Sequence, residues 1–267
     1  MNKIKNGSYF LKKSLKQYYY KPSLGFYRAV ELSILNKYVC FERPVLDIGC
    51  GDGTFISLLT KDKISLGLDI SRTAILKSKQ TNVYNESICA SATNLPIKDE
   101  SFNTVFSNCA IEHIQNIQEV LFEINRVLKN GGQLIFTVPS ENFDQFLFFY
   151  QFFRKIGFNR LAETYAATLD KRIHQIHKIS PKKWEKKLNN SNMVLEKAYY
   201  YHPSKAMKLW DVLNIQPLRI LSLIRFLPKF FIKKIVNIEF YIVSKLIDEA
   251  TWNICTEGGG LLIIAKK

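Results

Sequence analysis

PVLDIGCGDGTF, residues 44–55, is the stretch of this sequence that decides the fold. Val45, Leu46 and Ile48 form a short apolar run typical of a strand that is buried on both faces. An apolar spacing typical of a helix begins at Ile56. The glycines between them can take positive φ angles and let a ligand approach the backbone closely. The stretch therefore predicts a buried strand, a glycine loop that binds a nucleotide, and a helix.

The spacing of the loop distinguishes two classes of nucleotide ligand. A dinucleotide fingerprint requires Gly-x-Gly-x-x-Gly, but here the third glycine comes one residue early and Thr54 takes the expected place. Asp47 adds a carboxylate at the end of the strand, where a pyrophosphate would be repelled. A ligand that carries positive charge fits this loop better.

The loop resembles motif I of the class I S-adenosylmethionine-dependent methyltransferases, and the resemblance covers residues 41–140. Leu66–Ser71 is similar to the second strand of that family and contains Asp69, the acidic residue that accepts hydrogen bonds from both ribose hydroxyls there. The remaining motifs follow in family order, and this order resembles the branch called methyltransferase type 11. They are Leu95–Val105, Ala110–Ile114, Arg126–Gly132 and the strand Gln133–Pro139.

The resemblance implies an α/β fold: a doubly wound, seven-stranded, Rossmann-like sheet with an antiparallel last strand, plus helical cap insertions. It also implies S-adenosyl-L-methionine as the cofactor and no metal. The positions expected to bind the cofactor are Asp47, Gly49, Cys50, Gly51, Asp69, Ile70, Ser91, Ala92 and Asn108.

Each of these signals has a purely structural alternative. The glycine loop can be a simple turn, and either Asp69 or Ser71 can cap the helix that begins near Arg72. Ser91 stands where the type 11 pattern usually has an aspartate that holds the adenine amino group. An uncharged hydroxyl should contribute less to that hydrogen bond, by about 1 kcal/mol.

Methyl transfer to oxygen or nitrogen needs alignment of the acceptor and, for a hydroxyl acceptor, a base. His113 is the candidate base, because it follows the fourth predicted strand at the sheet edge where ligands bind, and histidine titrates near neutral pH. The alternative is a histidine that only packs the strand end. His174 and His177 lie either on one helical face of a lid or in a solvated loop.

Beyond the core, apolar side chains between Phe143 and Phe153 predict a lid helix after the fifth strand. Ser180 is expected to cap a helix that begins at Pro181. Met193–Tyr201 predicts a sixth strand, and Leu261–Ala265 a seventh strand that returns between the fifth and the sixth. The expected parts are an N-terminal helical segment (1–40), a cofactor-binding core (41–140), lid helices with the sixth strand (141–202), a helical insertion (203–250) and the last strand (251–267).

Positive charge is concentrated outside the core. The net charge is +7 over residues 1–40, −2 over 41–140 and +10 over 141–267. The same flanks are strongly apolar, notably 218–247, where basic residues interrupt every apolar run before it reaches the roughly 18 residues that span a bilayer. Two interpretations stay open: a surface for anionic membrane or a lipid-linked acceptor, or a helical cap packed on the core and solubilised by lysines.

The sequence therefore predicts a methyltransferase that acts on a small-molecule, saccharide or lipid-linked acceptor. The alternatives are an RNA methyltransferase acting on ribose or phosphate ends, and a non-catalytic protein that binds the cofactor. Nucleic acid is the less favoured partner, because Ser107–Ala110 lacks the Pro-Pro-aromatic clamp of enzymes that methylate adenine amino groups. The absence of a secretion signal and of Cys-x-x-Cys pairs predicts a cytoplasmic location, with peripheral contact to the inner face of the membrane as an option.

Overall fold

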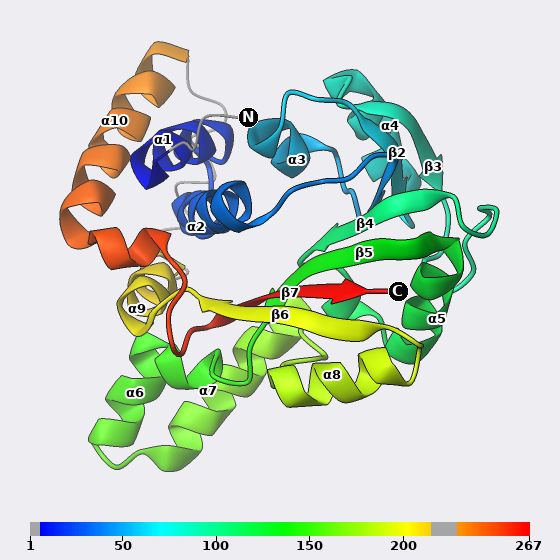
Figure 1. Ribbon diagram of the computed structural model, residues 1–267. Helices are drawn as coiled ribbons and strands as arrows, with labels where there is room; N and C mark the ends of the chain where they lie inside the picture. The colour runs from blue at the N-terminus through cyan, green and yellow to red at the C-terminus, as the bar shows by residue number, and fades with distance from the viewer. Residues whose placement is uncertain (1–5, 215–228) are drawn as a thin grey trace. The chain divides into compact units, whose positions relative to one another are not determined.

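A computed structural model describes residues 6–214 and 229–267 of the chain (Figure 1). The described residues form two compact units, and each unit is assembled from three separate segments of the chain. The sheet unit consists of Cys40–Glu141, Asp170–Tyr199 and Gly260–Lys267. The helical unit consists of the described residues within Met1–Val39, Asn142–Leu169 and Tyr200–Gly259.

Seven strands form one sheet in the order β3-β2-β1-β4-β5-β7-β6. Neighbouring pairs among β1 to β5 are parallel, and β7 runs antiparallel to β5. All four residues of β1 are buried, as its continuous apolar run predicts. This topology confirms the doubly wound sheet and its antiparallel last strand. The strands are β1 (Val45–Ile48), β2 (Ile64–Asp69), β3 (Tyr84–Cys89), β4 (Phe102–Asn108), β5 (Leu128–Pro139), β6 (Val194–Tyr201) and β7 (Gly260–Lys266).

Short helices connect these strands and pack on the sheet. The helix α4 packs against β2 and β3, α5 against β5, and α8 against β7. Ser71 caps α4, since its side-chain oxygen accepts a hydrogen bond from the N–H of Ala74. Ser180 stands at the N-cap of α8, but its side chain makes no capping hydrogen bond. The elements are α3 (Thr54–Leu59), α4 (Arg72–Thr81), the 3-10 turn η1 (Ile111–His113), α5 (Ile117–Val127) and α8 (Pro181–Asn189).

The strand β5 is longer than the sequence predicts. It begins at Leu128, directly after the last residue of α5, instead of at Gln133. Leu128 pairs with Phe102 of β4, and the register shifts before Gln133 pairs with Thr104. The pair Gly131-Gly132, which precedes the predicted strand, therefore lies inside the observed one, where Gly131 takes a φ of 74°.

The helical unit is built from two N-terminal helices, from α6 and most of α7, and from the helices between β6 and β7 in the chain. The helix α1 packs on α2 and α10, and α9 packs on α2 and α6. The elements are α1 (Gly7–Gln17), α2 (Pro22–Tyr38), η2 (Asp144–Phe146), α6 (Phe148–Lys155), α7 (Asn159–Ile173), α9 (Ser204–Leu213), α10 (Lys229–Leu246) and η4 (Glu249–Trp252). The last residues of α7 belong to the sheet unit.

Two expectations about the flanks change with the structure. The predicted lid helix is broken, because η2 ends at Phe146, Leu147 is extended, and a regular helix begins only at Phe148. Of the second apolar region, residues 218–228 lie outside the described part of the chain, and the rest forms α10. Among the described helices, none is long and apolar enough to cross a bilayer.

Candidate functional site

The loop after β1 takes the backbone form that its glycines permit. Gly49, Gly51 and Gly53 have φ angles of 72°, 56° and 76°. The N–H groups of Gly49 and Cys50 both donate to the carbonyl oxygen of Leu68, at 2.8 and 3.0 Å. The loop is thereby attached to the end of β2, so the ends of the two strands form one continuous edge.

Asp69, the last residue of β2, holds the same loop through its carboxylate. Its Oδ2 accepts a hydrogen bond from the N–H of Gly51 at 2.9 Å, and its Oδ1 accepts one from the N–H of Ser71 at 2.8 Å. An ionised carboxylate offers about four acceptor positions, so both oxygens keep capacity for further donors. Asp69 can therefore hold the loop and accept ligand hydroxyls together.

Asp47 lies beneath the loop and is buried. Its Oδ2 accepts a hydrogen bond from the hydroxyl of Tyr84 at 2.6 Å. Burial raises the pKa of Asp47 to about 7, the Tyr84 hydrogen bond opposes this shift, and the charge of Asp69 adds to it. Burial likewise raises the pKa of the neighbouring Cys50 thiol, which makes it a poor nucleophile.

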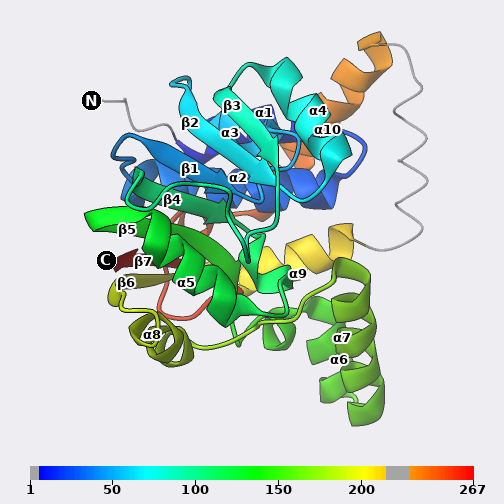
Figure 2. The same ribbon diagram turned by 90° about the vertical axis from the view of Figure 1, so that its right-hand side faces the viewer.

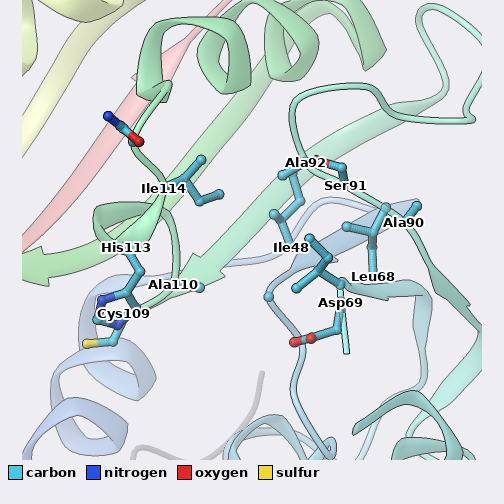
Figure 3. Close-up of a pocket in the computed structure, with 13 residues that line it drawn as sticks. Ile48, Leu68, Asp69, Ala90, Ser91, Ala92, Cys109, Ala110, His113 and Ile114 are labelled. Carbon is cyan, nitrogen blue, oxygen red and sulfur yellow. The ribbon is translucent and has the colours of Figure 1, made fainter. Parts of the chain in front are cut away.

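A cavity of ≈ 570 Å³ opens at this edge of the sheet, entirely within the sheet unit. Figure 3 shows Asp69 and Ser91 on one side of the cavity and His113 on the other. The volume lies within the range of about 300–1,000 Å³ found for small-molecule and cofactor sites. The lining residues are Ile48, Gly49, Leu68, Asp69, Ile70, Ala90, Ser91, Ala92, Cys109, Ala110, His113, Ile114 and Gln115.

His113 is held at the cavity wall by a segment that follows α7. Its ring Nδ1 lies 2.7 Å from the carbonyl oxygen of His174, and its Nε2 lies 3.7 Å from Oε1 of the buried Glu112. His177 makes two more bonds to the same turn: its N–H donates to the carbonyl of Glu112 at 3.3 Å, and its Nε2 lies 3.0 Å from the carbonyl oxygen of Ile114. The histidines at 174 and 177 therefore follow the end of α7 and do not share a helical face, because His174 has a φ of 55°.

The structure brings most of the predicted site residues to the cavity. Gly49, Asp69, Ile70, Ser91, Ala92 and His113 line it. Asp47, Cys50, Gly51 and Asn108 lie around the cavity and do not form its wall; Asn108 accepts a hydrogen bond from the hydroxyl of Thr137 at 2.9 Å.

Sequence reasoning missed two kinds of residue. The apolar lining positions Leu68, Ala90 and Ala110 could have been found, because each lies next to a predicted strand end. Tyr84 and the main chain of His174 carry no local signal for their roles, since their partners lie 37 and 61 residues away.

The sequence profile of the type 11 methyltransferase family, described as "Methyltransferase domain", matches residues 46–136. This range contains the glycine loop, Asp69 and His113. The chain contains a class I S-adenosylmethionine-dependent methyltransferase domain. The match confirms the resemblance drawn from the motifs.

The methyltransferase domain has curated relatives of known and unknown function. An uncharacterized protein of Methanocaldococcus jannaschii is 40% identical over 116 residues, which cover 42% of this chain and 48% of the relative. A malonyl-[acyl-carrier protein] O-methyltransferase of Marinomonas sp. is 32% identical over 103 residues, 36% of this chain and 38% of the relative. The chain thus spans about half the length, or less, of these two relatives.

Solved structures share the fold over most of the chain. A methyltransferase of Thermotoga maritima, described as a possible histamine N-methyltransferase, superposes with a TM-score of 0.58 at 17% identity and covers 96% of this chain and 99% of its own. A putative methyltransferase of Bacillus halodurans gives a TM-score of 0.53 at 20% identity and covers 89% of this chain and 98% of its own. At these identities the likeness concerns the fold alone.

The cavity of the methyltransferase domain fits S-adenosylmethionine, the cofactor of the family. A Cβ built on Gly49 would lie 2.2 Å from the Cβ of Ala110, so the backbone approaches this wall as closely as glycine allows. The carboxylate of Asp69 suits ribose hydroxyls, and the small and apolar side chains of Ala92, Leu68 and Ile70 suit a flat base. Among the described residues, no group of three or more His, Cys, Asp or Glu side chains could hold a metal ion.

Proposed function

We propose that this protein transfers a methyl group from S-adenosyl-L-methionine to an oxygen or nitrogen atom of a small-molecule, saccharide or lipid-linked acceptor. The observation that carries the proposal is one cavity of ≈ 570 Å³ that has Asp69 on one side and His113 on the other. A relative named as an O-methyltransferase supports an oxygen acceptor.

The cofactor, when bound, supplies a methyl group already activated by a sulfonium. The protein then has to bind the cofactor, align the acceptor with the methyl group and remove one proton from the acceptor. We propose that the Asp69 carboxylate accepts the ribose hydroxyls and that the Ser91 hydroxyl accepts from the adenine amino group. Gly49 and Gly51 let the loop backbone lie close to the ligand, while Ile70 and Ala92 exclude water from the base.

His113 is the proposed base. Its Nδ1 faces the carbonyl oxygen of His174, which cannot donate, so Nδ1 carries a hydrogen and Nε2 is the nitrogen available to take a proton from an acceptor hydroxyl. The side chain is 36% exposed, which leaves it accessible to a ligand in the cavity.

We also propose that the protein acts in the cytoplasm, with peripheral contact to the inner face of the membrane. The support is the coincidence of positive charge and apolar side chains in the flanks of the methyltransferase domain.

Titration calorimetry tests the cofactor site first. We expect S-adenosylmethionine and its demethylated product to bind with dissociation constants in the low micromolar range, about −8 kcal/mol. Asp69→Ala should lose about 2–4 kcal/mol of binding free energy. Asp69→Asn keeps an acceptor oxygen and should lose less. Asp62→Asn removes an equally negative but exposed side chain and is the matched control. Parent-like binding by Asp69→Ala would refute the assignment.

Labelled methyl donor incubated with lipid, saccharide and RNA extracts then identifies the acceptor class. With the acceptor in hand, His113→Ala should lower kcat by about 100-fold and leave cofactor affinity unchanged. Unchanged turnover would reduce His113 to a packing role. Incorporation into RNA alone, or into no extract, would favour the RNA methyltransferase or the non-catalytic binding protein.

A further inference from the structure

The hairpin formed by α6 and α7 exposes a series of large apolar side chains. The two helices lie side by side in both views (Figure 1, Figure 2). Five large apolar side chains on α6, in the turn that follows it and in the first turn of α7 are between 39% and 60% exposed. We call them the hairpin stripe: Phe148, Phe152, Ile156, Phe158 and Leu161.

Phe149 and Phe153, on the adjacent face of α6, connect the two helices of the hairpin. Their rings lie 5.7 and 6.2 Å from that of Tyr165. The hydroxyl of Tyr150 also donates to Oε1 of Glu163 at 2.8 Å. Phe148 and Phe152 of the stripe stack on each other at 6.3 Å and lie edge-on to Phe149 and Phe153 at 5.1 and 5.8 Å, yet both remain exposed.

Basic side chains outnumber acidic ones around the hairpin stripe. Asp144 and Glu163 flank it, and Glu163 accepts the hydrogen bond from Tyr150. Residues 145–162 contain no aspartate or glutamate. The basic residues of this span are Arg154, Lys155 and Arg160, and all three are exposed beside the turn. The turn itself is open, because Gly157 takes a φ of 85° with no neighbouring atom within 4 Å of an added Cβ.

We propose that the hairpin stripe and its three basic residues dock the protein on an anionic lipid bilayer. Phenylalanines and aliphatic side chains flanked by lysine and arginine are typical of segments that lie in the headgroup region without spanning it. The eight residues of α6 are far too few to cross a bilayer. Exposed apolar patches commonly mark surfaces that bind a macromolecule or a membrane. The positive charge beside this patch favours an anionic partner.

This inference rests on the peripheral location proposed above and names the segment responsible for it. It does not depend on methyl transfer, because the hairpin stripe contains no residue of the cofactor cavity. Cofactor binding measured without lipid therefore tests the proposed function separately.

Vesicle cosedimentation of the full chain is the experiment. The vesicles are phosphatidylcholine alone or with about 30% phosphatidylglycerol, each at about 0.05 and 0.5 M NaCl. The parent should pellet with anionic vesicles at low salt, and its binding should weaken about tenfold or more at high salt or on neutral lipid.

Variants of the hairpin stripe locate the contact. Phe152→Glu and Phe158→Glu should each weaken binding by about tenfold or more, whereas Phe122→Glu, an equally exposed phenylalanine on α5, should not. The pair Arg154→Gln, Lys155→Gln should weaken binding, and the exposed pair Lys182→Gln, Lys183→Gln on α8 should leave it nearly unchanged. Phe158→Trp supplies a direct signal, since its emission should shift to the blue with anionic vesicles only.

Circular dichroism and cofactor affinity show whether each variant is folded. If a charged variant does not fold, the emission of the tryptophan variant still tests the lipid contact. The proposal is wrong if the parent stays in the supernatant with anionic vesicles, or if Phe122→Glu weakens binding as much as Phe158→Glu. It is also wrong if the stripe variants instead abolish self-association in analytical ultracentrifugation without lipid, because the stripe is then an interface between copies of the chain.

Discussion

The ring Nδ1 of His113 lies 2.7 Å from the main-chain carbonyl oxygen of His174. A carbonyl oxygen only accepts, so this contact requires a hydrogen on Nδ1 and makes Nε2 the basic nitrogen of the neutral ring. The segment after α7 thereby sets the tautomer of a residue on the cavity wall.

Ring-nitrogen NMR can test this tautomer without a known acceptor. We expect neutral His113 to show a protonated Nδ1, while the exposed ring of His174 shows a mixture of tautomers. His174→Gly, which tolerates the φ of 55° at this position, should preserve the His113 tautomer. His174→Val disfavours that backbone conformation and should shift the tautomer. An unprotonated Nδ1 in the parent would contradict the contact.

Gly49 and Gly51 form a matched pair of loop substitutions. Both have positive φ, so an alanine at either position should cost about 1–2 kcal/mol of unfolding free energy. Gly49→Ala adds a clash, with its Cβ 2.2 Å from that of Ala110, whereas a Cβ on Gly51 meets open space. Urea unfolding and calorimetry should therefore show a clearly larger loss of stability and of cofactor affinity for Gly49→Ala. Equal losses would contradict the close approach of the loop to Ala110.

Asp47 should make the sheet unit less stable as the pH rises. Burial raises its pKa from 3.8 to about 7, so the folded state holds a proton that the unfolded chain releases. Its contribution to stability is fully present below about pH 4 and is lost as the pH rises to about 7, by up to about 4 kcal/mol.

The isosteric Asp47→Asn variant removes this dependence and can still accept from Tyr84. We expect urea unfolding to show a gain in stability at pH 8 and a much smaller change at pH 4. The same stability difference at both pH values would show that Asp47 is ionised throughout.

His202 should make the helical unit less stable as the pH falls. Its ring is fully buried, 4.0 Å from the ring of Tyr27, and burial together with the charge of Arg28 lowers its pKa to about 3. Its contribution to stability is therefore fully present above about pH 6.5 and is lost as the pH falls, by about 1.4 kcal/mol per unit until about pH 3.

Thermal unfolding of His202→Asn tests this acid sensitivity. Asparagine tolerates the φ of 59° at this position, so the comparison avoids backbone strain. Between pH 7.5 and pH 5, the unfolding free energy of the parent should fall by about 2 kcal/mol more than that of the variant. Parallel pH profiles for parent and variant would contradict the neutral, buried histidine.

Local chemistry accounts for what could be predicted from the sequence alone. The buried run of β1 and the three positive-φ glycines follow from residues close together in the chain, while the family resemblance implied the antiparallel last strand. Asp69 and His113 were placed at the cavity for the same reason, because the carboxyl ends of parallel strands meet at one edge of a sheet. Failures occurred where local signals compete, as in the Gly-Gly pair inside β5.

Tertiary structure alone decided the contacts that tune these residues. Tyr84 covers Asp47 and the main chain of His174 orients His113, although each pair is far apart in sequence. It also decided that Phe149 and Phe153 of α6 pack on Tyr165, while Phe152 on the same helix stays exposed. These contacts depend on which side chains meet when segments distant in the chain pack together. The sequence of one segment does not contain the free energy of that packing.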